Sequence, residues 1–565
     1  MQMDRSRDAG AFTQQVGKAS IRSFARTCYV ALAVLGGLPM LAAAAGSTGP
    51  TAGSADESRQ IYVSNSSGLD TNSGLTPNAP KRTLGAAYLE LRNNSGDKML
   101  LKRGDTWTNE TLYPSDRLWG KSGYSADQPI TVGAYGSGNR PIVRNSITPL
   151  RVQTSDGVSH FLVEDINFQA IRDATNGPQG IVWWATGGDF EMRDCRVQNF
   201  CLNLNIDAPA PMTASNLRFT RCEILDAFPG PSGPSQGAYV ANVHDVVFDE
   251  CVFDKNGYRY PDRMATMLNH NCYFSQSATG IVIKNSIVAR GSATGIQLRG
   301  QRMDAINNLV LGNPLGITMG HSAQTAEQIS RGVIYGNLVL DGADIGWGTN
   351  RLPRGFGISW GRVSQAVIED NIVAHGWTQV GFEPAYTVGD FAYNTVVRNN
   401  VGVDWNGPIL SVRTLLTDSA FIGENTFVNM PGRTVASIDM ASGVPADVGG
   451  NWGGNRYWGS GTSAFRPGQG NVSGYAVWED RTDDVIELND AGLTSANISM
   501  PYYLITQATH LPTPSDGAGA LDVFMEEVRS RPIKDQNEKF TALGYISWAR
   551  QRLGLPDLHG APQLP

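Results

Sequence analysis

Six short segments between residues 237 and 385 repeat one pattern of residue types. The second and fourth positions are mostly apolar, whereas the third and fifth are mostly polar or small, as in GAYVA at 237–241 and GIQLR at 295–299. Because side chains alternate between the two faces of a strand, the third and fifth positions should share one outward face. These positions hold Tyr239, Tyr273, Gln297, Arg299, Thr318, Ser359 and Glu383. Together such groups could move protons, pair with an anion and hydrogen-bond to hydroxyls.

These residue types suit the cleavage of a uronate polymer by elimination. That reaction needs a group that neutralises the carboxylate, a base for the adjacent C–H and an acid for the leaving oxygen. Arg299 could pair with the carboxylate or act as the base, and Tyr273 or Tyr239 could be the base or the acid. His270 precedes the second segment and follows a long predicted loop, which makes it another candidate base. We therefore predict these four residues as catalytic.

Other polar and aromatic residues near these segments are candidates for substrate binding. Arg362 could hold the carboxylate of a second sugar, and tryptophans on predicted loops could stack on sugar rings. Trp360, by contrast, should point inward by the same alternation. The predicted substrate-binding residues are Gln297, His321, Arg362, Glu383, Trp347 and Trp377.

Three other functions stay open at this point. A glycoside hydrolase would need two carboxylic acids, and Glu383 could act with a loop acid, namely Asp262, Asp341 or Asp344. An epimerase would share the first step of the elimination and then return the proton. A secreted β-helix that binds glycans without cleaving them is the non-catalytic alternative. The mixture of Tyr, Arg, Gln and Glu at the outward third and fifth positions favours an enzyme.

Longer repeats predict the fold that positions these residues. Strings such as FLVEDI at 161–166, FEMRDC at 190–195 and VIEDN at 367–371 recur roughly 22 to 34 residues apart, the range of coil-type repeats. Alternating apolar residues would fill the interior of a coil, and the recurring Cys or Asn would mark a turn, where one Asn can hydrogen-bond to the Asn of the next rung. We predict an all-β fold, a right-handed parallel β-helix. Hairpin signals are too sparse for a propeller or a sandwich.

The beginning of the predicted coil shows a family resemblance. IYVS at 61–64, a turn-rich segment, KRTLGAAYLEL at 81–91 and LLKRGDTW at 100–107 give the order strand, turn, short helix and strand. This order resembles the opening of secreted right-handed parallel β-helix proteins, including pectate-lyase-like polysaccharide lyases. The resemblance implies a polysaccharide-degrading enzyme with a groove along one face. On physical grounds, the short helix should cap one end of the coil.

Composition divides the chain into four parts. Residues 1–45 contain basic residues, an apolar run and a small-residue end, which predicts a signal peptide and a secreted or periplasmic protein. Residues 46–57 are a predicted linker and 58–480 the predicted β-helix. Residues 481–565 are a C-terminal extension, in which a helical period over 521–553 predicts a helical cap. No segment after residue 45 is apolar enough to cross a bilayer, so we predict no membrane association after signal removal.

Charge limits the ligands that the chain could bind. The net charge is −7, and removal of the predicted signal peptide, with five basic and two acidic residues, moves it to about −10. This charge argues against nucleic acid as a partner. Residues 284–362 nevertheless hold eight Lys or Arg against four Asp or Glu, which predicts a bounded anionic ligand such as an acidic polysaccharide.

Cofactors and covalent links are predicted to play little part. The outward positions lack the cluster of carboxylates that Ca²⁺ prefers. We therefore predict no cofactor, and Ca²⁺ is the alternative. Cys195, Cys222 and Cys251 lie in matching strings and should stack inside the coil as small packed side chains, with a disulfide between them left open. We expect a monomer.

Overall fold

The computed structural model divides into two units, residues 1–51 and 52–565, and everything described below belongs to the second. The described residues are 58–171, 177–210, 214–229, 234–258, 267–320, 330–342, 355–376, 385–389, 392–405, 408–413, 419–428, 438–440, 451–458, 465–466, 485–487 and 519–562.

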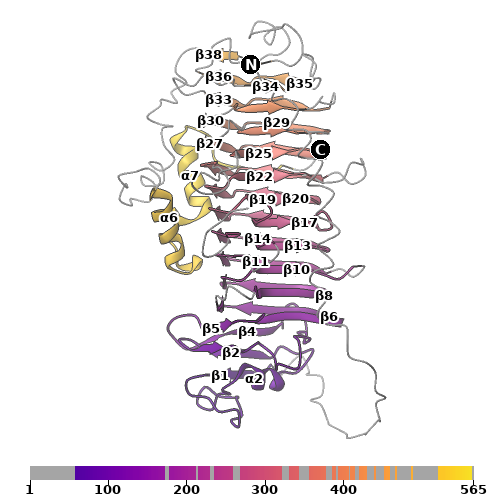
Figure 1. The fold of residues 1–565 in the computed structure, drawn as a ribbon, viewed down its shortest axis with the longest axis vertical. Coiled ribbons are helices and arrows are strands. Elements are labelled where there is room, and N and C mark those ends of the chain that lie inside the picture. Colours follow the sequence, from indigo (N-terminus) through magenta and orange to yellow (C-terminus); the bar gives the residue numbers. More distant parts are fainter. Residues whose placement is uncertain are drawn as a thin grey trace, which may run out of the picture. The chain divides into compact units, whose positions relative to one another are not determined.

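The strands form a parallel coil in which, from β10 (Leu202–Asp207) to β36 (Arg456–Trp458), each turn of the chain, or rung, adds one strand to each of three faces (Figure 1). One such rung consists of β13 (Gln236–Ala241), β14 (Val243–Asp249) and β15 (Val252–Asp254). Each of these strands pairs in parallel with the matching strand of the next rung. The predicted parallel β-helix is therefore confirmed, and alternation within each strand sends apolar side chains into one continuous core.

Membership of the parallel ladders defines the three faces. The first face contains β10 (Leu202–Asp207), β13, β16 (His270–Phe274), β19 (Thr294–Leu298), β22 (Leu315–Met319), β25 (Phe356–Trp360), β28 (Tyr386–Val388), β31 (Leu410–Val412), β34 (Ile438–Met440) and β37 (Phe465–Arg466). The second face contains β1 (Gln60–Val63), β2 (Lys98–Lys102), β4 (Ile130–Tyr135), β6 (Leu150–Glu164), β8 (Gln179–Arg193), β11 (Ala214–Thr220), β14, β17 (Thr279–Lys284), β20 (Gln301–Ile306), β23 (Ser330–Tyr335), β26 (Val363–Glu369), β29 (Thr395–Arg398), β32 (Phe421–Gly423) and β35 (Asn451–Gly453). The third face contains β3 (Thr106–Thr108), β5 (Ile142–Asn145), β7 (Asn167–Ala170), β9 (Arg196–Gln198), β12 (Glu223–Leu225), β15, β18 (Ile287–Ala289), β21 (Leu309–Leu311), β24 (Leu338–Leu340), β27 (Ile372–Gly376), β30 (Val401–Trp405), β33 (Thr426–Val428), β36 (Arg456–Trp458) and β38 (Val485–Glu487).

Two long strands join the first face to the second. The first part of β8 pairs with β10 of the first face, and its second part pairs with β11 of the second face. The bend between these parts lies at Gly187, whose φ of 99° and close contact with the backbone of Val158 exclude a side chain. β6 pairs with β8 along both parts.

The corner from the second face to the third face is the most regular feature of the coil. From β6 to β36, two residues connect each second-face strand to the following third-face strand, and the first of them has a left-handed backbone, as in Glu250 (φ 54°) and Asp370 (φ 58°). The second residue points into the core. In the later rungs it is asparagine, and each amide donates to the next, as Asn337 Nδ2 does to Asn371 Oδ1 at 2.9 Å. The complete ladder is Asn308, Asn337, Asn371, Asn400, Asn425 and Asn455.

In three earlier rungs cysteine occupies the same corner position, and in two others Ile166 and Ser286 occupy it. Cys195, Cys222 and Cys251 are buried and free, and the thiol of Cys222 donates to Met192 O at 3.2 Å. The predicted internal stack is confirmed, and its thiols are unlinked. Burial raises the pKa of the Cys222 thiol, which keeps it protonated and unreactive.

A short helix covers the first rung of the coil, as predicted. Helix α2 (Leu84–Glu90) begins at Thr83, whose hydroxyl accepts a hydrogen bond from Ala86 N at 3.2 Å. Its buried face joins the core, where the Tyr88 ring meets the Trp119 ring edge-on at 5.3 Å. In Figure 1, α2 lies beside β1.

The C-terminal helices lie elsewhere than expected. Helices α6 (Gly519–Ser530) and α7 (Ala542–Arg552), with short turns of 3-10 helix at Ile533–Asp535 and Glu538–Phe540, pack along the third face and do not cap an end of the coil (Figure 1). Third-face strands such as β21, with the sequence LVL, are apolar on both sides, so their outward residues must also be covered. The coil also runs past the expected boundary at residue 480, because β38 still pairs with β36.

Candidate active site on the first face

The predicted outward residues form one register-matched file on the first face. Tyr239 lies opposite Tyr273, and Tyr273 lies opposite Gln297. The file continues through Thr318 and Ser359. The alignment of the first five segments is confirmed. We call the residues in this row, from Asn205 to Ser411, the outward file; its other members are Tyr239, Tyr273, Gln297, Thr318, Ser359 and Thr387.

The sixth segment was aligned four residues too early. Thr387, and not Glu383, lies opposite Ser359. Two overlapping alternations, at 381–385 and 385–389, compete at this point of the sequence, and the hydrogen-bonded ladder selects the second. Glu383 itself lies outside the described residues.

Two stacked tyrosines and an arginine form the centre of the file. The rings of Tyr239 and Tyr273 are 5.6 Å apart with an interplanar angle of 15°. Arg299, directly after β19, donates from Nη1 to the Tyr273 hydroxyl at 3.4 Å, and its guanidinium carbon lies 5.9 Å from the centre of the Tyr273 ring. The expectation that Tyr273 and Arg299 emerge together on one sheet is confirmed. The Arg299 guanidinium and the hydroxyls and stacked rings of Tyr239 and Tyr273 therefore lie close together on adjacent rungs.

His270 lies against this centre but is buried, with 6% of its surface exposed. Its ring centre is 5.4 Å from that of Tyr273, and its Nδ1 accepts a hydrogen bond from Thr294 N at 3.3 Å. Burial, followed by the charge of Arg299, lowers the pKa of His270 to about 3. A neutral imidazole with Nδ1 occupied carries its proton on Nε2, which favours a donor role over the predicted role of base.

Asp207 is a further ionisable residue at this face, and it was not among the predicted site residues. It ends β10 and lies opposite Ala241, while its neighbour Asn205 lies opposite Tyr239. Its Oδ1 accepts a hydrogen bond from Asn242 Nδ2 at 2.7 Å, and burial raises the pKa of the carboxyl although that hydrogen bond opposes part of the effect. Residues 203–207 follow the same apolar and polar alternation, so the signal that places Asp207 on this face was present in the sequence.

Several oxygens of this file are buried without a hydrogen-bond partner among the described residues. They are Gln297 Oε1, Thr318 Oγ1 and Thr387 Oγ1. Buried polar atoms in native proteins nearly always have a partner, and leaving one unpaired costs about 1–3 kcal/mol. Atoms that could accept from or donate to a ligand's hydroxyls therefore line the outward file over several rungs.

The remaining predicted residues are not brought to this centre. Arg362 is one residue beyond the position that matches Arg299, which Gly361 occupies, and its φ of 54° places it in the turn toward β26. Trp360 points into the core, as expected. Asp341 lies near Tyr545 of α7, whose pKa burial and the Asp341 charge raise. Outside the described residues are His321, Trp347, Trp377, Glu383, Asp262 and Asp344.

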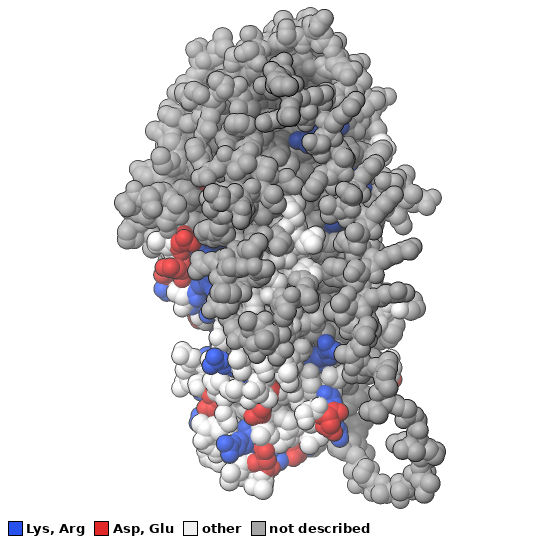
Figure 2. Space-filling view, viewed as in Figure 1, with Lys and Arg blue, Asp and Glu red and all other residues white. Residues whose placement is uncertain are grey.

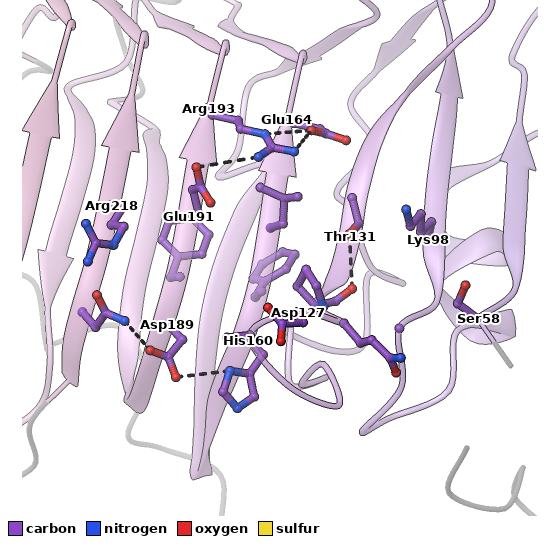
Figure 3. A pocket seen from close by; sticks show the side chains of 18 residues that line it. Ser58, Lys98, Asp127, Thr131, His160, Glu164, Asp189, Glu191, Arg193 and Arg218 are labelled. Carbon is purple, nitrogen blue, oxygen red and sulfur yellow. Dashed lines mark hydrogen bonds and ion pairs between the residues drawn. The ribbon is translucent and has the colours of Figure 1, made fainter. Parts of the chain in front are cut away.

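A separate cavity of about 730 Å³ lies on the second face between β2 and β11 (Figure 3). Its charged groups largely compensate one another: Arg193 donates from Nε and Nη2 to Glu164, and His160 Nδ1 lies 3.1 Å from Asp189 Oδ2. Figure 2 likewise shows acidic and basic side chains interspersed over the described part of the visible surface. Among the described residues that line this cavity, His160 Nδ1 is buried without a hydrogen-bond partner.

The described residues contain no group of three or more His, Cys, Asp or Glu side chains that could hold a metal ion. Among the helices that the structure describes, none is long and apolar enough to span a membrane.

Comparison with known proteins gives similarity in fold only. No protein-family model and no curated sequence matches the chain. Similar solved structures include a GH136 lacto-N-biosidase from Eubacterium ramulus (13% identity, TM-score 0.36, 76% of this chain and 68% of that chain). The pectate lyase Pel9A (16%, 0.34, 66% and 79%) and a mannuronic acid specific polysaccharide family 6 lyase from human gut microbiota (13%, 0.40, 76% and 92%) are also similar. We transfer no residue role from these proteins.

Proposed function

We propose that this chain is a carbohydrate-active enzyme that cleaves an acidic polysaccharide by β-elimination on its first face. The observation that carries the proposal is the contact of Arg299 with the Tyr273 hydroxyl, with Tyr239 stacked beside them and neutral His270 behind. This set supplies the three groups that elimination of a uronate requires: a cation for the carboxylate, a proton acceptor and a proton donor.

The outward file supports an extended substrate. Its strands are about 4.8 Å apart and present side chains in register, so successive sugar rings of a polymer can meet successive rungs. Gln297 and Thr318 would hydrogen-bond to hydroxyls of the sugars beside the cleaved one. The guanidinium of Arg299 would pair with the carboxylate of the sugar that loses its proton, since arginine binds carboxylates through two parallel N–H donors.

Asp207 keeps a second reaction open. A buried carboxyl with a raised pKa is the usual general acid of a glycoside hydrolase, which also needs a second carboxylate at a defined distance. Glu383 and a loop aspartate were the predicted acids. A hydrolase that uses Asp207 as its acid is therefore the alternative to the lyase.

The deciding experiment incubates the full chain with polymannuronate, polyguluronate and polygalacturonate, and follows two signals. Elimination yields an unsaturated uronide that absorbs in the ultraviolet, together with one new reducing end per cleavage. Hydrolysis yields reducing ends without that absorbance and would reject the lyase. Neither signal on any polymer would favour a glycan-binding protein without catalytic activity.

The signal-like residues 1–45 support a secreted or periplasmic location, and we propose a monomer that acts without a bound cofactor. Size-exclusion chromatography with light scattering, and activity after dialysis against a Ca²⁺ chelator, test these two proposals. A dimer, or loss of activity that Ca²⁺ restores, would contradict them.

A further inference from the structure

We infer that the two stacked tyrosines divide the proton transfers: Tyr273, beside Arg299, removes the proton from the sugar carbon, and Tyr239, on the Asp207 side, protonates the bridging oxygen. The inference rests on the proposed elimination and assigns its base and its acid. Nothing in the sequence separates the two residues, which occupy the same position in neighbouring segments.

The cation at one end of the pair distinguishes Tyr273. Arg299 Nη1 donates to the Tyr273 oxygen at 3.4 Å, and the guanidinium carbon lies 5.9 Å from the ring centre. The guanidinium thus places a cationic N–H donor on the oxygen that would take the proton, next to the negative charge that a base carries there. Arg299 can make this contact while other N–H groups of its fork face a substrate carboxylate.

The other end of the pair lies on the side of the Asp207 carboxyl. Burial raises the pKa of Tyr239 to about 12, and the charges of Asp207 and Tyr273 act in the same direction, while a hydrogen bond with Ser275 opposes them. The Tyr273 ring is stacked on that of Tyr239 at 5.6 Å, so the two hydroxyls act on adjacent rungs. The raised pKa means that Tyr239 keeps its proton, as an acid must.

The step balances without any co-reactant. The Tyr273 phenolate takes the proton from C5 of the uronate, the C4–O bond breaks, a double bond forms between C4 and C5, and the bridging oxygen takes the proton of Tyr239. A proton then passes from Tyr273 to the neighbouring Tyr239 through solvent, which restores the starting state. The sugar that becomes unsaturated lies over Tyr273, so the reducing end of the polymer extends over Gln297 and Thr318.

Deuterium exchange separates the two roles. In D₂O, Tyr239→Phe should still exchange the C5 proton of the polymer cleaved by the wild type, as followed by NMR, while its cleavage falls at least 100-fold. Tyr273→Phe should lose both exchange and cleavage. The matched control is Tyr124→Phe, because Tyr124 is exposed and lies away from this face.

The outcomes distinguish this inference from the proposed function. Exchange that survives in Tyr273→Phe but not in Tyr239→Phe, or cleavage that survives in either variant, overturns the assignment while an active wild type upholds the lyase. A wild type that neither exchanges nor cleaves any of the three polymers overturns the lyase and the assignment together. Circular dichroism and polymer affinity of both variants, expected to match the wild type, exclude misfolding as the cause.

Discussion

At the scale of single residues, Asp207 should control the alkaline limit of activity without taking part in the proton transfer itself. Its negative charge helps to raise the pKa of Tyr239, so Asp207→Asn should lower that pKa. If Tyr239 must be protonated to act, the alkaline limb of the kcat profile then moves to lower pH.

The measurement is a pH profile of kcat for Asp207→Asn, with Asp245→Asn as control because Asp245 is exposed and paired with His244 at 2.9 Å. An alkaline limb that stays in place in Asp207→Asn, or that moves equally in the control, contradicts the prediction. A shift accompanied by an unchanged KM would show that Asp207 positions and polarises Tyr239 and does not bind the sugar.

His270 makes a second prediction, which concerns stability. Its pKa in the folded chain is about 3, below the value of about 6.5 expected for an unfolded chain. The unfolded state therefore binds one more proton between these two values, and stability should fall as pH falls through this window, by up to about 1.4 kcal/mol per pH unit.

Urea unfolding at pH 7 and pH 5 tests this for the wild type and for His270→Gln. The wild type should lose about 1–2 kcal/mol more than the variant between these pH values. Equal losses in the two proteins would show that His270 does not remain neutral in the folded chain.

Alternation within a strand sufficed to place Tyr239, Tyr273 and Gln297, because a strand has only two faces. It did not suffice for Arg362, which lies in the turn after β25, or at 381–389, where two overlapping alternations compete. Asp207 was missed although Leu204 and Ile206 show the same inward positions as the recognised segments.

At the scale of strands, the unpartnered hydroxyls of Thr318 and Thr387 should cost stability and serve the substrate. Thr318→Val and Thr387→Val remove a buried oxygen that has no partner in the described structure, so the free protein should be unchanged or up to about 1 kcal/mol more stable. Affinity for long oligosaccharides should fall about 5- to 10-fold, which corresponds to about 1–1.4 kcal/mol.

Thr395→Val is the matched control for this pair, because Thr395 is buried and its hydroxyl donates to Tyr393 O at 3.3 Å. It should lose about 1 kcal/mol of stability and leave affinity unchanged. Thermal unfolding and titration calorimetry provide both values. Equal destabilisation of all three variants would mean that Thr318 and Thr387 are satisfied in solution.

The strands were largely predictable from the sequence, but the position of the helices that pack on the third face was not. Repeated strings located the second-face strands and the corner residues, because burial of alternate residues repeats with every rung. The apolar outer surface of the third-face strands was not predicted. The segments LVL at 309–311 and at 338–340 are apolar on both faces of the strand, which indicates that other elements pack against both faces. This signal could have placed the C-terminal helices.

At the scale of the whole unit, the contact between α6 and the third face depends on a buried carboxylate. Asp254 is fully buried, and Arg290 from the next rung and Arg529 from α6 both contact it, the latter at 2.8 Å. Removing one partner of a buried charge is costly, so Arg529→Ala should destabilise the protein by about 3 kcal/mol.

The control is Arg531→Ala, whose pair with Glu527 is solvent-exposed and should contribute less than about 0.5 kcal/mol. Urea unfolding measures both variants. A loss of less than 1 kcal/mol in Arg529→Ala would indicate that apolar packing alone holds α6, through residues such as Phe524 and Met525.

The two-residue corner between the second and third faces constrains how such a chain can change. From β6 to β36 it keeps two residues, a left-handed one and a buried one, whereas the other two corners, where connections differ in length from rung to rung, both border the first face. Changes in chain length are thus confined to the edges of the outward file. A coil built in this way can acquire a new ligand by exchanging loops while every rung of its scaffold stays the same.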